Sequence, residues 1–254
     1  MFLETRALTK TFGGLTAVER VDFAMEKGQI ISIIGPNGAG KTTFFNMISG
    51  YYRPDHGSII FEGQDVTSYN PEKVAGCGIA RTFQNIRLFP DLMAVENVLI
   101  GMHLHLKSNL WQIIMKTASE KAEEQRAYDR AVDLLAYAGL AGKEQELARS
   151  LSYGDQRRLE VARALAVNPR LLLLDEPTAG MNPRETDEMQ AYILKLRDDL
   201  QLSIILIEHD MKVVMGISDH ITVLNYGVKI ASGTPAEVRS NPEVNRAYLG
   251  QEAI

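Results

Sequence analysis

The chain has 254 residues, 45% of them hydrophobic and 23% charged, which is ordinary for a globular protein with a full hydrophobic core. The net charge of −5 argues against a nucleic-acid-binding protein, and the single cysteine, Cys77, excludes an internal disulfide and indicates a reducing compartment. The longest apolar runs, such as 171–174 and 204–207, are far below the roughly 20 residues of a membrane helix. Any work at a membrane is therefore expected to go through a partner.

The first part of the chain is expected to hold strands around one helix. Residues 21–26 alternate between apolar and polar side chains, and 29–34 is an apolar run that ends at Gly35. Residues 41–49 then have a helical pattern that Gly50 closes, and 57–61 is expected to be a further strand. A strand, a glycine-rich loop and a helix therefore follow one another.

The loop 35–42, Gly-Pro-Asn-Gly-Ala-Gly-Lys-Thr, fits the G-x-x-x-x-G-K-[ST] pattern. Its glycines allow the backbone to point several N–H groups inward, and the following helix directs its positive end to the same point. Lys41 adds a full charge near the β- and γ-phosphates, and the Thr42 hydroxyl is suited to Mg²⁺. A plain glycine-rich turn does not need the Lys-Thr pair, so we favour nucleotide binding over that alternative.

The region from about residue 96 to 167 is mostly helical in its pattern. The apolar positions 128, 131, 132, 135 and 138 fall on one face at helical spacing. We expect an inserted helical lobe here. Strands and helices alternate again afterwards, with strands expected at 171–174, 203–207 and 221–224 and a helix at 184–200. The alternation predicts an α/β fold with a mainly parallel sheet covered by helices.

Two carboxylates, Asp175 and Glu176, follow the apolar run 171–174. Ligands of open α/β sheets lie at the carboxyl ends of strands. Asp175 is therefore a candidate for holding Mg²⁺ through water, and Glu176 for polarising an attacking water. An acidic turn at the end of a strand is the alternative, and the phosphate loop in the same chain makes it the less favoured one.

With these motifs placed, the chain resembles an ABC transporter nucleotide-binding subunit. The segment 151–156, Leu-Ser-Tyr-Gly-Asp-Gln, looks like the family signature; Gln84 matches the Q-loop glutamine and His209 the switch histidine. The segments 81–89, 156–160, 208–215 and 246–250, and the long stretch 103–126, resemble the ATP-binding subunits of branched-chain amino-acid importers, of the LivG type. The resemblance covers nearly the whole chain.

The resemblance implies a P-loop NTPase fold, an ABC ATPase core with an antiparallel β subdomain and an inserted helical lobe. It implies one nucleotide-binding domain over 1–254, with the Q-loop and helical lobe at approximately 85–165. It also implies ATP hydrolysis with ATP and Mg²⁺ as cofactors. The catalytic residues implied are Glu176, His209, Lys41 and Gln84. The nucleotide-binding residues implied are Phe12, Val18, Asn37, Gly38, Ala39, Gly40, Lys41, Thr42, Thr43, Ser152, Gly154 and Gln156. The metal ligands implied are Thr42, Gln84 and Asp175.

Some of these positions have a second interpretation. Phe12 is suited either to stacking on adenine or to simple core packing, with Val18 as a second apolar contact. Ser152 is suited to capping the helix that begins near Gly154, and in the family this end faces the γ-phosphate held by another subunit. Asp155 departs from the common Leu-Ser-Gly-Gly-Gln pattern, as does the tyrosine at 153. We expect the Asp155 carboxylate to face away from nucleotide, because it would repel phosphate.

The partners that the resemblance implies are membrane-spanning permease subunits and a second ABC cassette, either a related chain or a second copy, with a solute-binding protein involved indirectly and no nucleic acid. Four apolar residues after Gln84 belong either to the core or to a groove that receives a permease helix: Phe89, Leu92, Met93 and Val95. The amphipathic stretch 110–115 could pack in that groove or on the helical lobe.

The expected location is the cytoplasmic face of the inner membrane, as a peripheral protein. Other cargo, urea or lipopolysaccharide, and a soluble non-transport ABC ATPase are the alternatives.

Overall fold

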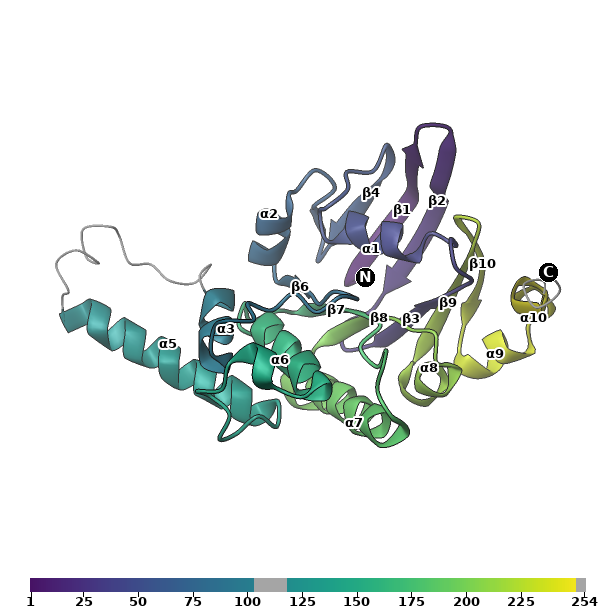
Figure 1. The fold of residues 1–254 in the computed structure, drawn as a ribbon. Coiled ribbons are helices and arrows are strands. Elements are labelled where there is room, and N and C mark those ends of the chain that lie inside the picture. The colour runs from purple at the N-terminus through teal and green to yellow at the C-terminus, as the bar shows by residue number, and fades with distance from the viewer. Residues whose placement is uncertain (103–117, 250–254) are drawn as a thin grey trace. The chain divides into compact units, whose positions relative to one another are not determined.

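A computed structural model of the protein describes residues 1–102 and 118–249 (Figure 1). The chain forms two compact units: the first is Met1–Arg81 with Arg170–Ile254, and the second is Thr82–Pro169. The long stretch 103–126 lies partly, and the stretch 110–115 wholly, outside the described residues. The expectation of one nucleotide-binding domain over the whole chain stays a prediction.

A six-stranded sheet forms the centre of the first unit, in the order β10-β9-β3-β8-β7-β6. All neighbours in it are parallel except β9 and β10, which form an antiparallel hairpin. Its strands are β3 (Ile30–Ile34), β6 (Ile79–Arg81), β7 (Leu171–Asp175), β8 (Ser203–Ile207), β9 (His220–Asn225) and β10 (Val228–Gly233). The carboxyl ends of β3, β7 and β8 therefore meet at one edge of the sheet.

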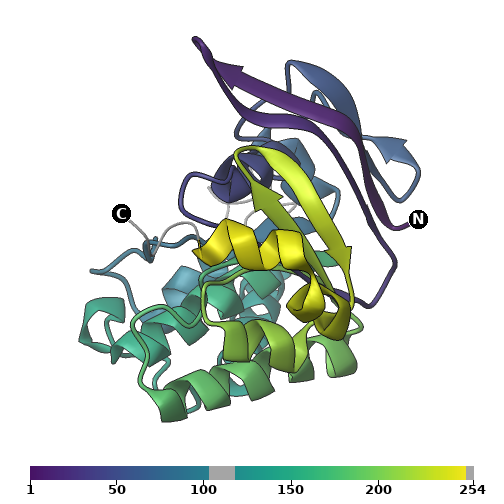
Figure 2. The same ribbon diagram turned by 90° about the vertical axis from the view of Figure 1, so that its right-hand side faces the viewer.

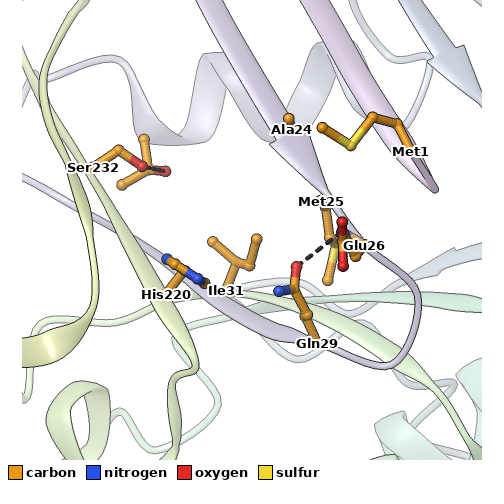
Figure 3. A pocket seen from close by; sticks show the side chains of 9 residues that line it. Met1, Ala24, Met25, Glu26, Gln29, Ile31, His220 and Ser232 are labelled. Carbon is orange, nitrogen blue, oxygen red and sulfur yellow. Dashed lines mark hydrogen bonds between the residues drawn. The ribbon is translucent and has the colours of Figure 1, made fainter.

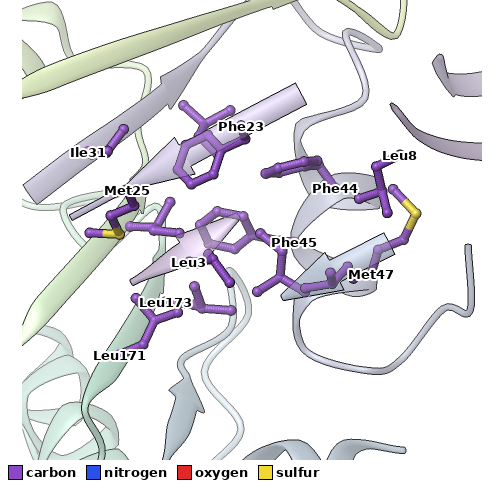
Figure 4. Close-up of a cluster of buried hydrophobic side chains, with 14 of the residues drawn as sticks. Leu3, Leu8, Phe23, Met25, Ile31, Phe44, Phe45, Met47, Leu171 and Leu173 are labelled. Carbon is purple, nitrogen blue, oxygen red and sulfur yellow. The ribbon is translucent and has the colours of Figure 1, made fainter. Parts of the chain in front are cut away.

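The main core of the first unit lies around helix α1 (Lys41–Ile48), between the six-stranded sheet and a second sheet (Figures 1, 2 and 4). Alternate residues of the parallel strands, including Ile31 and Ile33 of β3, point into this cluster, as the two-residue period of a strand requires. Phe44 and Phe45 of α1 are almost completely buried within it. This packing fixes the helix whose first residue is Lys41.

The second sheet is antiparallel, with the order β2-β1-β4-β5. Its strands are β1 (Leu3–Phe12), β2 (Leu15–Met25), β4 (His56–Phe61) and β5 (Gln64–Asp65), and helix α2 (Pro71–Gly76) follows them. Phe2 and Phe61 contact edge to face, with ring centroids 5.0 Å apart. Phe12 lies at the end of β1 in this sheet.

The remaining helices of the first unit are α7 (Pro183–Leu200), α8 (Met211–Ile217), α9 (Pro235–Ser240) and α10 (Pro242–Leu249). A separate core cluster joins Ile34 of β3 to Val214 of α8 and Val238 of α9. Helix α7 begins with a capping box, in which the side chains of Asn182 and Glu185 each accept a hydrogen bond from the main-chain N–H of the other.

The second unit contains α3 (Ala94–Gly101), α5 (Ala118–Tyr137), the short 3₁₀ helix η2 (Ala148–Ser150) and α6 (Tyr153–Leu165). Helices α3 and α6 pack closely at Gly101. A Cβ at this position would lie 2.5 Å from the Arg163 carbonyl oxygen, so the close approach depends on glycine. Ala131 and Leu135 of α5 and Ala138, which directly follows it, are buried, and Tyr128 and Val132 are half-buried, in agreement with the predicted apolar face.

The predicted fold class is confirmed, with a mainly parallel sheet, an antiparallel sheet and a helical unit. The predicted strands at 57–61, 171–174, 203–207 and 221–224 are present within one residue at each end, as is the helix predicted at 184–200. Among the described helices, none is long and apolar enough to cross a membrane.

Candidate functional site: a phosphate loop and the acidic ends of neighbouring strands

The loop between β3 and α1 has the conformation that its glycines were expected to permit. Gly35, Gly38 and Gly40 have positive φ angles of 151°, 79° and 97°. A Cβ at Gly40 would lie 2.3 Å from the Ala17 carbonyl oxygen, and one at Gly35 would lie 2.1 Å from that of Leu224. Only glycine fits at these two positions, so the tight curl of the loop is fixed by sterics.

The other loop residues predicted to bind nucleotide differ in their exposure. Asn37, Gly38 and Thr42 are exposed, Thr43 is half-buried and Ala39 is buried. Helix α1 begins at Lys41, so its free N–H groups and positive dipole end lie at this loop. The loop and the helix together make an anion site of the kind that holds phosphate.

Lys41 is folded back onto the loop. Its Nζ donates hydrogen bonds to the carbonyl oxygens of Gly35, at 2.6 Å, and Pro36, at 2.9 Å. Burial lowers the pKa of Lys41, while the charges of Glu176 and Asp175 oppose this shift. Two of the three N–H donors of the ammonium group are thus used within the loop, and the third is available for a phosphate oxygen.

Asp175, Glu176 and His209 come together at the carboxyl ends of β7 and β8. Asp175 pairs with Ile207 in the sheet, so Glu176 and His209 follow from neighbouring strand ends. Nε2 of His209 lies 3.0 Å from Oε1 of Glu176. Because an ionised carboxylate can only accept, Nε2 donates this hydrogen bond. Glu176 has a φ of 50°, an unfavourable value for a side chain other than glycine, of the kind that clusters at functional sites.

A buried ion pair that the sequence did not indicate holds the Asp175 carboxylate. Nη2 of Arg81, the last residue of β6, lies 2.8 Å from Oδ2 of Asp175, and both side chains are almost completely buried. Nη1 of Arg81 donates to Asn46 Oδ1, at 2.6 Å, and to Ser49 Oγ, at 3.0 Å. Arg81 therefore ties the candidate metal carboxylate to the helix that carries the phosphate loop.

Replacing Arg81 with methionine is expected to lower the free energy of unfolding by about 3 kcal/mol, because it leaves the Asp175 charge buried without the guanidinium. Urea unfolding of the nucleotide-free protein measures this value. Arg184→Met is the matched control, since its ion pair with Glu188 is exposed and contributes at most about 1 kcal/mol. If the free energy of unfolding falls equally in the two variants, the buried ion pair has no special structural role.

Glu208 is a further residue that the sequence analysis missed. Its side chain is buried, and it accepts hydrogen bonds from the main-chain N–H groups of Thr178 and His209, each at 2.9 Å, and from the Thr178 hydroxyl. It thereby joins the loop after Glu176 to the loop that carries His209. The signal was available, because Glu208 directly follows an apolar strand just as Asp175 does.

The candidate adenine site lies at the end of β1. Phe12 is 42% exposed, so it is not part of the core. Its ring meets Tyr52 edge to face, with the centroids 5.2 Å apart, and Nζ of Lys10 lies 5.5 Å from its centroid. Val18 is completely buried and presents no surface to a ligand in this structure. An exposed aromatic face held by a second ring is suited to stacking on a base.

The signature segment begins helix α6 in the second unit. Ser152 caps the helix by accepting a hydrogen bond from the Asp155 N–H, as predicted. Asp155 turns its carboxylate to Lys143, whose Nζ lies at 2.6 Å, and to the Ser152 hydroxyl, at 2.8 Å. Burial opposes ionisation, but these two hydrogen bonds together with the charges of Lys143 and Arg158 lower the pKa of Asp155. Gly154 and Gln156 are half-buried, and Gln156 donates to the Leu151 carbonyl.

Gln84 lies in the second unit and is exposed, whereas Thr42 and Asp175 belong to the first unit. Among the described residues, no group of three or more His, Cys, Asp or Glu side chains could hold a metal ion. A hydroxyl such as that of Thr42 and a carboxylate such as that of Asp175 nevertheless fit Mg²⁺, which takes few protein ligands and completes its shell with water and phosphate oxygens. The roles of Gln84, Thr42 and Asp175 at a metal stay predictions.

A pocket of about 330 Å³ lies elsewhere in the first unit (Figure 3). Its lining includes Glu26, Gln29, Ile31 and His220, near the amino ends of β3 and β9. The phosphate loop follows the carboxyl end of β3, so this pocket lies at the opposite end of that strand. None of the residues predicted to bind nucleotide lines it.

The glycine loop on α1 and the carboxylates that end neighbouring parallel strands define a P-loop nucleotide-binding protein. A model of the ABC transporter family matches residues 18–179, and a model described as a branched-chain amino acid ATP-binding cassette transporter matches residues 228–254. The chain belongs to the ABC transporter family, as an ATP-binding cassette.

Two curated relatives match over almost their whole length. The high-affinity branched-chain amino acid transport ATP-binding protein BraF of Pseudomonas aeruginosa is 47% identical over 249 residues, covering 98% of both chains. The corresponding protein LivG of Escherichia coli strain K12 is 46% identical over the same coverage. A nucleotide-free ATP-binding cassette from an ABC transporter superposes with a TM-score of 0.85 at 32% identity, covering 97% of this chain and 98% of that one.

Proposed function

We propose that this chain is the ATP-hydrolysing subunit of an importer for branched-chain amino acids. The main support for ATP hydrolysis is the distance of 3.0 Å between Glu176 Oε1 and His209 Nε2. It places a candidate general base beside a group that can orient it. The solute class rests on the 47% identity with BraF and on the match of residues 228–254 to a family model for this class of cassette.

In the proposed reaction, the N–H groups of loop 35–42 and the ammonium group of Lys41 bind the β- and γ-phosphates. Glu176 takes a proton from a water molecule whose oxygen attacks the γ-phosphorus. The bond to the bridging oxygen breaks, and ADP and inorganic phosphate leave. His209 holds the Glu176 carboxylate through Nε2. Mg²⁺ held near Thr42 and Asp175 would supply charge neutralisation on the phosphates.

We further propose that two cassettes act together. Ser152 and Gly154 begin helix α6, and the N–H groups at this helix end are suited to the γ-phosphate of a nucleotide held by a second subunit. Asp155 does not stand against this role, because its carboxylate is directed to Lys143 and Ser152. The second cassette is a related chain or another copy, and both attach to permease subunits at the cytoplasmic face of the inner membrane.

Uptake of radiolabelled leucine tests the solute class directly. A strain that lacks this chain is expected to lose high-affinity leucine uptake and to regain it with the wild-type gene but not with Glu176→Gln. Unchanged leucine uptake together with lost urea uptake would instead favour the other cargo. Affinity purification from membranes provides the second arm: two multi-span permeases and a second cassette are expected, whereas recovery with ribosomes or DNA would contradict a transport function.

A further inference from the structure

Two buried, oppositely charged side chains of α6 face the main chain of the loop 83–87, which we call the Q-loop. Arg157 donates from Nη1 to the Phe83 carbonyl oxygen, at 2.8 Å, and from Nη2 to that of Gln84, at 2.5 Å. Oε1 of Glu160 accepts from the N–H groups of Phe83 and Arg87, each at 3.3 Å. The main chain is therefore held on both sides of Gln84 by one face of one helix.

This arrangement is specific in its geometry. Arg157 and Glu160 are three residues apart on α6, so they lie on the same side of the helix, 3.5 Å from each other. They are only 3% and 1% exposed. Burying two charges is unfavourable unless close pairing and hydrogen bonds offset the loss of water. Burial raises the pKa of Glu160, and the hydrogen bonds from the loop together with the charge of Arg157 oppose that shift.

The same helix carries the signature residues at its first turn. Ser152 caps α6, and the hydroxyl oxygen of Tyr153 accepts a hydrogen bond from Nη2 of Arg157, at 2.9 Å. The distance along the helix from Tyr153 to Arg157 is about one turn. Hydrogen bonds through Arg157 therefore connect the Gln84 carbonyl oxygen to the first turn of α6.

We propose that Arg157 and Glu160 are positioning residues that make the Q-loop and the signature end of α6 move as one body. This inference rests on the proposed function, in which Gln84 responds to the nucleotide of its own subunit while Ser152 and Gly154 contact that of the second subunit. The two residues, which we call the α6 clamp, would then couple the two ATP sites. ATP hydrolysis by the paired cassettes should be cooperative for this reason.

The double variant Arg157→Met with Glu160→Leu removes the clamp and leaves no buried charge behind. Replacing a buried ion pair by apolar residues is often close to neutral for stability, so the protein should fold. Hydrogen exchange of the Phe83 and Arg87 amides is expected to speed up by about tenfold in the nucleotide-free protein, since each loses its acceptor. Exchange at the wild-type rate would overturn the proposal. If the double variant does not fold, Arg157→Lys replaces it in the measurement of cooperativity, because it keeps the charge but loses the planar fork that binds the carbonyl oxygens of Phe83 and Gln84.

The second readout separates coupling from a purely structural role. Wild-type hydrolysis is expected to have a Hill coefficient approaching 2 for ATP, and the clamp variant a value near 1, with the affinity of the isolated cassette for ATP within about twofold of the wild type. If the amides exchange faster in the clamp variant but its Hill coefficient equals that of the wild type, the clamp is only a structural contact. This result would overturn the proposed coupling of the two ATP sites. A non-cooperative wild type would overturn it as well.

Two further variants serve as controls. Glu160→Gln keeps an oxygen acceptor for the two amides, so it should retain slow exchange and cooperativity, even though the unpaired charge of Arg157 lowers the free energy of unfolding. Arg149→Met removes an exposed arginine of the same unit, paired with Asp91, and should change neither readout. Absence of hydrolysis in the wild type and in both controls would instead reject the proposed function. The exchange experiment uses no nucleotide, so it reports on the clamp independently of that outcome.

Discussion

Glu176→Gln is expected to lower the rate of ATP hydrolysis by about 10²- to 10⁴-fold, the usual contribution of a positioned general base. Glutamine keeps the size of the side chain and an oxygen that can accept from Nε2 of His209, now 3.0 Å from Glu176 Oε1. It cannot take a proton from water. The phosphate loop is unchanged, so ATP should still bind, and the unhydrolysed nucleotide should favour the closed pair of cassettes.

Steady-state phosphate release measures the loss, and calorimetry measures ATP affinity. Glu188→Gln is the matched control, because it makes the same change of charge on the exposed side of α7 and should leave turnover intact. Light scattering with ATP is expected to show a stable dimer for Glu176→Gln and a transient one for the wild type. Normal turnover in Glu176→Gln would contradict the assignment of Glu176 as the general base.

The parts of this site that depend on neighbouring residues in the chain could be predicted from sequence. The loop 35–42 carries its chemistry in consecutive residues, and its strand and helix are adjacent, so pattern and spacing were sufficient to predict the loop between them. Asp175 and Glu176 were predictable for the same reason, because a buried strand shows as an apolar run and a polar residue at its end reaches the sheet edge. Ser152 followed from the rules of helix capping.

The contacts between distant segments could not be predicted in this way. Arg81 reaches Asp175 because β6 lies next to β7 in parallel register, with Arg81 opposite Leu173, and nothing local specifies this pairing. The α6 clamp likewise joins positions more than 70 residues apart. Lys41 was expected at phosphate, and the structure shows that it also donates to the carbonyl oxygens of its own loop. Such contacts depend on tertiary packing, which a single sequence does not encode in any short pattern.

Lys41→Met is expected to weaken ATP binding by roughly 10- to 100-fold, since a hydrogen bond to a charged group is worth about 1.5–3 kcal/mol. Calorimetry measures the affinity directly. The nucleotide-dependent rise in melting temperature, which reports binding to the folded state alone, should shrink in parallel. Lys27→Met, in an exposed turn before β3, is the control and should bind ATP like the wild type.

The same variant should reveal that Lys41 is held for binding at the expense of stability. Burial lowers the pKa of Lys41 below its ordinary value of 10.5, so the folded protein disfavours the charged form. At neutral pH the charged lysine therefore destabilises the nucleotide-free fold, and this penalty fades as the pH rises through the lowered pKa toward 10.5. Methionine has no such penalty, because it does not titrate.

The stability of Lys41→Met relative to the wild type is accordingly expected to be most favourable near pH 7 and to decline as the pH approaches 10.5. Urea unfolding at several pH values, without nucleotide, measures the difference. Two carbonyl oxygens lose the ammonium donor in this variant. Their loss changes the stability difference by the same amount at every pH, so it leaves the dependence on pH unchanged. A flat difference across this range would show that the Lys41 pKa is not lowered, and that the phosphate loop holds its lysine without strain. A declining difference together with lost ATP affinity would identify Lys41 as a partly desolvated charge that lowers the stability of the fold and strengthens ATP binding.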